Sequence, residues 1–314
     1  ITCRDWSSDV CSSDLLDAPW QASHSGWIGQ MGQQYVRHRF NRAGRYGEPG
    51  RHFVHLGFYA PHPPLNPTRE MFAPYDGIKI PEPTWGENEW ADKPDAMARM
   101  MRSVEDWTLE RFIQYRRHFY AMVTGVDMAI GQVMQSLEAD GLLDETLIVF
   151  SSDHGDMCGD HHMLLKQQAY FDEVMRVPCV MFWPGGFGTK GRRIDGLIEK
   201  LDVLPTLLEL TGTAIPDVMM GRSYAEALRS GRPIDARDDV LAYAGEGWAS
   251  LRSQQYNYAC YGPGQEVLFN LADDPGERVN VIAAQPRAAD EMRRRLMHRL
   301  IEASRSVQPK NFRY

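Results

Sequence analysis

The chain has 314 residues, 43% of them hydrophobic and 11% aromatic, which is enough apolar material for one large domain or two smaller ones. Acidic residues outnumber basic residues 42 to 34, the net charge is -8, and no basic run is interleaved with aromatics, so nucleic acid is not an expected partner. No apolar stretch approaches the roughly 20 residues that span a bilayer, so we expect no membrane span. Five scattered cysteines without a CxxC pair, and an amino terminus without a signal-peptide pattern, leave periplasmic, secreted and cytoplasmic locations open.

The amino-terminal part of the chain contains one predicted strand. Residues 1–15 have neither an apolar period nor turn signals, and we expect an extraneous or disordered segment there. Residues 44–50 form a glycine-rich loop, and the short apolar run 52–59 then predicts a buried strand. Consecutive prolines end this strand at Pro61-His62-Pro63-Pro64.

The middle of the chain alternates between helix and strand. Residues 108–140 carry apolar side chains at steps of three and four, which predicts a long helix. The runs 146–150 and 177–183 predict buried strands, the first covered on both faces because polar and apolar residues do not alternate. Asp202 can cap a short helix over 203–210. This order of elements is typical of an α/β fold.

The pattern of predicted elements changes beyond about residue 235, where short strand candidates are separated by turn residues. Strands are predicted near 240–243, 248–253, 255–261 and 266–271, followed by an arginine-rich helix from about Arg287. This pattern predicts a small antiparallel sheet with one helix.

The segment Ser151-Ser152-Asp153-His154-Gly155-Asp156 follows directly on the predicted strand 146–150. Open α/β sheets bind their ligands at the carboxyl ends of strands. Asp153 offers a carboxylate oxygen and His154 an imidazole nitrogen, which suits two contacts to one divalent metal ion. The alternative is a loop aspartate that caps a helix beside a surface histidine.

A second group of polar residues surrounds this candidate metal site. His161, His162 and Lys166 place two imidazoles and an ammonium group within the next dozen residues. Lysine can neutralise a bound oxyanion while a histidine protonates a leaving oxygen, which suits an anionic substrate. Loop packing is an equal alternative for each histidine. His62, held between prolines, is a further candidate for a general acid or oxyanion donor, the alternative being a turn histidine without a role.

Taken together, these segments resemble the sulfatases of the alkaline-phosphatase-like superfamily, over about residues 20–280. Each segment alone is a weak signal, whereas so many in family order are specific. The matching segments are 57–64, 120–127, 152–156 with Lys166, 176–178, 183–185, 202–208, 221–223 and 268–277. The resemblance implies an alkaline-phosphatase-like α/β fold with a mostly parallel sheet sandwiched by helices and a small C-terminal antiparallel sheet plus helix. Residues 16–235 would be the C-terminal part of the catalytic domain and 236–314 a small α+β subdomain.

The resemblance also implies roles for individual residues. Asp153 and His154 would ligate one divalent metal ion, usually Ca²⁺ in sulfatases, with Mn²⁺ as the alternative because nitrogen ligands are less usual on calcium. His62 and Lys166 would contact the sulfate group and assist departure of the alcohol. His161 would contribute to substrate binding beside them.

The chain departs from the family pattern upstream of these motifs. Sulfatases carry there a pair of metal-binding aspartates, a Lys-x-His pair, and a Cys-x-Pro-x-Arg or Ser-x-Pro-x-Arg segment whose first residue becomes formylglycine. None of the three occurs upstream of residue 57 in this chain. We therefore expect an amino-terminally truncated sulfatase, with formylglycine in the missing part, that hydrolyses nothing by itself.

Two other functions compete with hydrolysis of a sulfated small molecule or glycan. A phosphonate monoester or phosphodiester hydrolase of the same superfamily shares the layout, whereas a two-metal phosphatase is disfavoured because His298 is the only histidine after His162. A noncatalytic, sulfatase-like protein that binds an anionic glycan is the alternative from a different class. The oligomeric state stays open.

Overall fold

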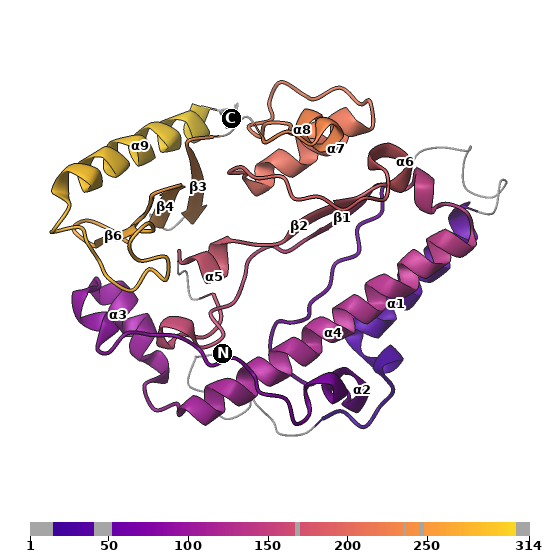
Figure 1. Cartoon of the computed structure of the whole chain (residues 1–314), viewed down its shortest axis with the longest axis horizontal. Helices are drawn as coiled ribbons and strands as arrows, with labels where there is room; N and C mark the ends of the chain where they lie inside the picture. Colours follow the sequence, from indigo (N-terminus) through magenta and orange to yellow (C-terminus); the bar gives the residue numbers. More distant parts are fainter. Residues whose placement is uncertain (1–14, 41–51, 167–169, 235–236, 245–247, 306–314) are drawn as a thin grey trace, which may run out of the picture. The chain divides into compact units, whose positions relative to one another are not determined.

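The structure, a computed structural model, describes residues 15–40, 52–166, 170–234, 237–244 and 248–305 (Figure 1). The predicted glycine-rich loop and almost all of the segment 1–15 lie outside these residues. The chain divides into two compact units, the first from the described parts of Ile1–Thr84, Asp106–Val149 and Val180–Gly188, and the second from those of Trp85–Glu105, Phe150–Cys179 and Thr189–Tyr314. No helix among the described residues is long and apolar enough to cross a membrane.

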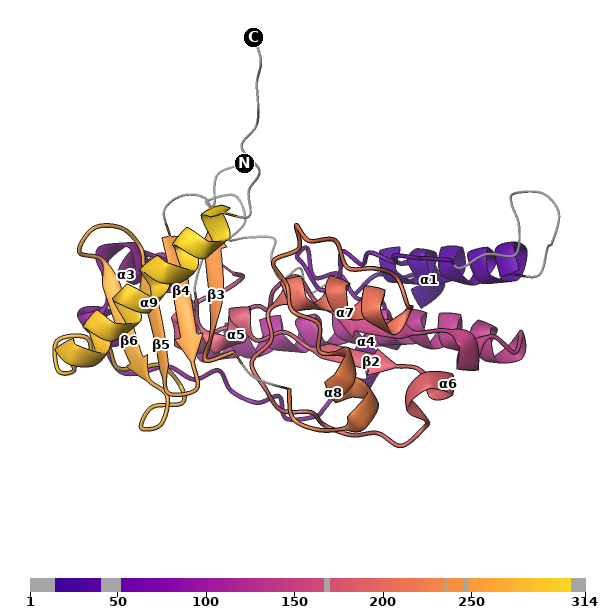
Figure 2. The same cartoon turned by 90° about the horizontal axis from the view of Figure 1, so that it is seen from above.

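The first unit is built on two helices that lie side by side in both views, α1 (His24–Tyr35) and α4 (Leu109–Ala139) (Figures 1 and 2). A Cβ atom on Gly29 of α1 would lie 3.0 Å from the Cβ of Ala129, so glycine permits this close approach. The predicted helix 108–140 is confirmed, with the Thr108 hydroxyl accepting a hydrogen bond from the N–H of Arg111 at 3.3 Å. The remaining elements here are η1 (Trp20–Ala22), η2 (Val36–Phe40), α2 (Arg69–Phe72), η3 (Ala73–Tyr75), η6 (Leu143–Glu145) and α6 (Pro184–Phe187).

The predicted buried strands are found only in part. Residues 52–59 belong to no strand, and the side chain of Phe53 is 80% exposed, so that prediction is wrong. The other two strands form as β1 (Ile148–Ser151) and β2 (Cys179–Phe182), which pair in a two-stranded sheet. Their predicted burial is wrong, because a strand is covered on both faces only within a wider, layered sheet.

The second unit contains the small antiparallel sheet that the sequence predicts. Its order is β3-β4-β5-β6, with α9 across one face (Figure 2). The strands and helix are β3 (Asp239–Ala244), β4 (Trp248–Ser253), β5 (Tyr256–Cys260), β6 (Glu266–Asn270) and α9 (Pro286–Arg305). Leu251, Tyr258 and Leu268 of the sheet are buried against Met292 and Leu296 of the helix. Alternation along β5 and β6 thus supplies one apolar face for α9 and leaves another for the rest of the unit.

The opposite face of this sheet packs against the loop that follows the Asp153-His154 segment. Met157 and Met163 of that loop are fully buried in a cluster with Phe171 and with Val267 and Phe269 of β6. The sheet therefore holds the loop that follows Asp153 and His154 in place through apolar packing. The other elements of the second unit are η4 (Glu89–Asp92), α3 (Asp95–Met101), η5 (Arg102–Val104), η7 (Asp160–His162), α5 (Asp172–Met175), η8 (Lys200–Asp202), α7 (Val203–Leu210) and α8 (Ala225–Ser230).

The predicted cap of the helix over 203–210 differs from the observed one. Asp202 does occupy the N-cap of α7, but its side chain makes no capping hydrogen bond with that helix. Its carboxylate instead accepts hydrogen bonds from the backbone N–H groups of Glu199 and Arg222 and from the guanidinium group of Arg237. The Asp202 carboxylate therefore binds the buried guanidinium group of Arg237, which lies 35 residues away in sequence, instead of capping α7.

Candidate functional site

The loop after β1 is threaded tightly against α5. The N–H of Gly155 donates to the carbonyl oxygen of Val174 at 2.8 Å, and a Cβ atom at position 155 would lie 1.9 Å from the carbonyl oxygen of Glu173. Only glycine fits that approach of two backbones. The Ser152 hydroxyl donates to the carbonyl oxygen of His154 at 2.7 Å. The loop conformation is therefore specified by its own sequence and by the neighbouring helix.

Asp153 and His154 present two metal-ligating atoms close together. The Nδ1 atom of His154 lies 2.8 Å from the carbonyl oxygen of Gly155. A carbonyl can only accept, so Nδ1 carries the proton and the lone pair of the neutral ring is on Nε2. That Nε2 atom lies 3.6 Å from Oδ2 of Asp153, and the side chains are 32% and 80% exposed. Two donors at this spacing can contact one cation.

The Asp153 carboxyl is held in its ionised form. Burial raises its pKa, but the electrostatic interaction with the neighbouring His154, hydrogen bonds from the backbone and the ammonium group of Lys200 together lower it below the usual value. Among the residues that the structure describes, no group of three or more His, Cys, Asp or Glu side chains could hold a metal ion. Asp153 and His154 thus fit part of the ligand shell of a divalent ion, which takes about six to eight ligands in the case of Ca²⁺.

His161 is buried inside the second unit. Its side chain is 3% exposed, with Nδ1 2.5 Å from Oε1 of Glu89 and Nε2 3.7 Å from Oε2 of Glu173. The ring stacks on Phe171 at a centroid distance of 3.8 Å. Burial lowers the pKa of His161, but the two carboxylates outweigh it and raise the pKa to about 9. The imidazolium therefore joins three segments of the chain, and its burial does not fit direct contact with substrate.

The loop between the metal pair and Lys166 has an unusual backbone. Cys158, His161, His162 and Leu165 all adopt positive φ angles of 47–60°. Such conformations cost roughly 1 kcal/mol or more per residue and persist only where surrounding contacts impose them. One such contact is the Asp156 carboxylate, which accepts from the N–H groups of Cys158 and Leu165 at 2.8 and 3.2 Å.

The two remaining predicted residues of this loop differ in exposure. His162 is half-buried, with its ring edge-on to Trp85 at 5.2 Å and its Nδ1 atom 3.3 Å from the carbonyl oxygen of Met101. The side chain of Lys166 is exposed. These contacts are consistent with loop packing for His162 and with a solvent-facing ammonium group at Lys166.

His62 is fixed by its immediate neighbours in the first unit. Its N–H donates to the carbonyl oxygen of Tyr59 at 3.0 Å, and its Nδ1 atom lies 2.8 Å from the carbonyl oxygen of Pro63. Its ring lies 4.9 Å from the ring of Tyr59. As in His154, the carbonyl fixes the proton on Nδ1 and leaves Nε2 to act. The other predicted residues, Asp153, His154, His161 and Lys166, belong to the second unit.

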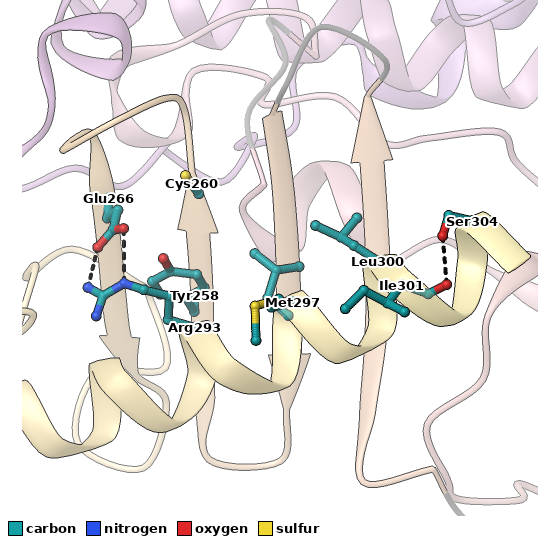
Figure 3. Close-up of a pocket in the computed structure, with 9 residues that line it drawn as sticks. Tyr258, Cys260, Glu266, Arg293, Met297, Leu300, Ile301 and Ser304 are labelled. Atoms are coloured by element: carbon teal, nitrogen blue, oxygen red, sulfur yellow. Dashed lines mark hydrogen bonds and ion pairs between the residues drawn. The ribbon is translucent and has the colours of Figure 1, made fainter.

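A groove between α9 and strands β5 and β6 contains none of the predicted residues (Figure 3). Its apolar wall includes Met297, Leu300 and Ile301 of α9. Its charged groups, Glu266 and Arg293, are paired with each other at 2.5 Å, as the dashed lines show. A helix-on-sheet groove with neutralised charges lacks the convergent polar groups of a catalytic site.

The structure also reveals residues that sequence reasoning missed. Glu89 and Glu173 enclose His161, and the ammonium group of Lys200 donates to the carbonyl oxygen of Asp153 at 2.9 Å. Glu89 is 72 residues from His161, and Lys200 is 47 residues from Asp153, so no local pattern links either pair. The sequence shows only a capping-box pattern around Lys200, with Glu199 and Asp202 at its two ends.

The fold and the Asp153-His154 pair define an alkaline-phosphatase-like α/β protein with a candidate site for a divalent ion. The family model described as Sulfatase matches residues 8–213, and the one described as N-sulphoglucosamine sulphohydrolase, C-terminal, matches residues 159–306. The first match covers about two thirds of the chain. The chain belongs to the sulfatase family.

Individual relatives agree with this family. The chain is 30% identical to the multifunctional alkaline phosphatase superfamily protein PehA of Trinickia caryophylli, over 92% of this chain and 62% of the relative. It is 28% identical to an arylsulfatase of Clostridium perfringens, over 91% of this chain and 58% of the relative. The solved phosphonate monoester hydrolase of Agrobacterium radiobacter superposes with a TM-score of 0.74 at 25% identity, covering 91% of this chain and 62% of that one. The chain thus spans about 60% of the length of these relatives.

Proposed function

We propose that this chain is the part of a metal-dependent sulfatase that carries two metal ligands and the groups that bind the sulfate ester. The observation that carries the proposal is the Asp153-His154 pair, in which the bond from Nδ1 to Gly155 leaves Nε2 free, 3.6 Å from the Asp153 carboxylate. The pair lies within the residues that match the Sulfatase family model. The substrate would be a sulfated small molecule or glycan.

Each group has a defined task in this proposal. Asp153 and His154 would hold one divalent ion, Ca²⁺ or alternatively Mn²⁺, which when bound neutralises negative charge on the sulfate ester. Lys166, exposed next to the metal loop, would donate to a sulfate oxygen. His62 would give the proton on Nε2, once charged, to the departing alcohol. His161 would position the loop instead of binding substrate.

The nucleophile would come from sequence outside these 314 residues. A formylglycine residue requires a Cys or Ser followed by Pro and Arg at spacings of two, and the chain contains no such segment. Residues 16–235 would then form the C-terminal part of the catalytic domain, with 236–314 as a small α+β subdomain and 1–15 as extraneous sequence.

A second candidate is a phosphonate monoester or phosphodiester hydrolase. The likeness to the phosphonate monoester hydrolase of Agrobacterium radiobacter favours it specifically, because that structure superposes over 91% of the chain. Sulfate and phosphonate esters are both tetrahedral anions, so the same cation and lysine can serve either. A noncatalytic glycan-binding protein is the third candidate.

Metal binding by the chain tests the site itself. Titration with Mn²⁺, followed by electron paramagnetic resonance, is expected to show one site that Asp153→Asn weakens at least tenfold. Asp217→Asn, which changes an exposed loop carboxylate, is the matched control and should leave the affinity unchanged. Equal Mn²⁺ affinities for the two variants would contradict the assignment.

Turnover separates the candidate reactions. The complete protein that carries this sequence, assayed with an aryl sulfate and an aryl phosphonate monoester in Ca²⁺ or Mn²⁺, should have the higher kcat/KM on the sulfate. A higher value on the phosphonate would favour the second candidate. No turnover of either ester would favour the noncatalytic protein.

A further inference from the structure

Lys200 is a cation beside the metal pair to which the family resemblance assigns no role. It lies in η8, and its side chain is exposed. Its Nζ atom donates to the carbonyl oxygen of Asp153 at 2.9 Å, and both residues belong to the second unit. An exposed lysine often has no defined position, but the turn that carries Lys200 is held on both sides by buried carboxylates.

One side of the turn that carries Lys200 is fixed by Asp202, which is 2% exposed. Its carboxylate accepts from the N–H of Glu199 at 2.8 Å and from the N–H of Arg222 at 2.6 Å. The guanidinium group of Arg237 pairs with both carboxylate oxygens. A buried carboxylate with this many donors holds the backbone on either side of Lys200.

The other side of the turn is fixed by Glu199, which is 9% exposed. Its Oε1 atom accepts from the N–H of Leu241 at 2.9 Å and from Arg299 of α9 at 2.5 Å. Its Oε2 atom lies 3.3 Å from Nη1 of Arg237. Three segments of the second unit thus converge on residues 199 and 202, and they hold Lys200 on a rigid base. The segments contain Arg222, Arg237 with Leu241, and Arg299 of α9.

Close backbone packing adds a further restraint on the same turn. A Cβ atom at Gly221 would lie 1.9 Å from the carbonyl oxygen of Leu201. The turn therefore has no room to shift toward residue 221. What remains free is the end of the Lys200 side chain, whose three N–H donors have one partner among the described residues, the Asp153 carbonyl.

We propose that Lys200 contacts the anionic group of the substrate beside the Asp153-His154 pair. This inference rests on the proposed function, because it takes the pair as the place where cation and ester anion meet. The two N–H groups of Lys200 without a partner in the described chain donate to anion oxygens while the third keeps its bond to Asp153. The same charge repels a metal ion at Asp153, so Lys200 makes anion binding and metal binding mutually dependent.

A purely structural role for Lys200 predicts a different result. If the lysine only fastened the Asp153 carbonyl, then loss of its charge would leave anion affinity unchanged as long as a hydrogen-bond donor remained. Glutamine keeps a donor near that carbonyl and removes the charge. Lys200→Gln therefore separates the two roles, and Lys200→Arg restores the charge.

The experiment measures binding of inorganic sulfate to the 314-residue chain in chloride buffer containing Mn²⁺, by isothermal titration calorimetry. Lys200→Gln is expected to weaken sulfate binding about tenfold, the size of one lost charge-assisted hydrogen bond. Lys200→Arg is expected to lie within about threefold of the unmodified chain. Lys190→Gln removes an exposed lysine of a neighbouring loop and should change nothing. Circular dichroism melting of each variant confirms that it is folded.

Two results would overturn the proposal: equal sulfate affinity in Lys200→Gln and the unmodified chain, or no sulfate binding by the unmodified chain. In parallel, Mn²⁺ titration without sulfate should show that Lys200→Gln binds the metal at least as tightly as the unmodified chain. The Asp153→Asn titration judges the proposed function separately. Mn²⁺ binding that depends on Asp153, combined with sulfate binding that ignores Lys200, would refute the lysine contact alone.

Discussion

Apolar side chains occur both in the antiparallel sheet that packs against α9 and in the extended segments of the α/β part, but they differ in burial. Leu251 and Leu268 of the antiparallel sheet are fully buried, whereas Phe53 is 80% and Val180 54% exposed. Paired residues of neighbouring antiparallel strands lie at most 14 residues apart in sequence, and the helix that covers the sheet begins 16 residues after β6. Strands of an α/β sheet depend on neighbours far along the chain. Self-contained pairing is what distinguishes the two regions.

The largest expected effect comes from the buried ion cluster above the antiparallel sheet. His161→Ala leaves the carboxylates of Glu89 and Glu173 without their cation and should lower the free energy of unfolding by about 3–5 kcal/mol. Urea unfolding measures the loss. His298→Ala, on the exposed side of α9, is the control and should fall within about 0.5 kcal/mol of the unmodified chain. A small effect at both positions would mean that the cluster contributes nothing.

The next effect tests the comparison directly with two apolar truncations. Leu268→Ala empties a fully buried position between the sheet and α9 and should cost about 2–5 kcal/mol. Phe53→Ala removes a larger side chain from an exposed position and should cost less than about 0.5 kcal/mol. Chemical denaturation of both variants measures the two losses in the free energy of unfolding. A cost at Phe53 as large as at Leu268 would contradict the difference in burial.

Stability should also depend on pH, by up to about 3 kcal/mol for each of two groups. The pKa of His161 is raised to about 9 in the folded state, so its contribution is complete below about pH 6.5 and is lost as the pH rises through 9. Burial and the charge of Asp172 raise the pKa of Glu277 to about 7, which makes stability fall with rising pH in a lower window, between about 4.5 and 7. Unfolding free energies measured from pH 5 to 9 should therefore decrease. A rise above pH 6.5, or an unchanged upper slope in His161→Ala, would refute the assignment.

The smallest effect concerns the first unit and its long helix. Thr108→Ala removes the hydroxyl that caps α4 and should cost about 1 kcal/mol. Thr189→Ala, an exposed loop threonine, is the matched control. Thermal unfolding followed by helical ellipticity compares them. Equal midpoints would show that the start of α4 does not limit the stability of this unit.

Local signals account for what the sequence could predict. The apolar period of α4, the turn-separated strands β3 to β6 and the final helix were all readable, because each depends on residues near one another in sequence. The segment 52–59 has the composition of a buried strand but forms no strand, because composition does not tell whether a strand has neighbours. The Asp153-His154 pair was readable as a motif, and its geometry was not.

Buried charges explain the rest of what the sequence concealed. His161 was predicted from its place in a polar run, but its partners Glu89 and Glu173 come from other segments and turn it into a buried cation. The position of Asp202 before an apolar helix predicts a helix cap, yet its carboxylate binds Arg237. A pairing of this kind is decided by three-dimensional proximity, which a single sequence does not display.

The arginines of α9 stabilise the segments that carry the candidate site, although none of them is a site residue. A chain cut before Pro286 would keep every residue that the site requires, yet it would lose Arg299, which pairs with Glu199 and with Asp239, and Arg295, which also pairs with Asp239. Glu199, next to Lys200, would then keep Arg237 as its charged partner, whereas the buried Asp239 would lose both of its arginines. Removal of α9 is therefore expected to weaken anion binding at Lys200, although α9 supplies no residue of the candidate site.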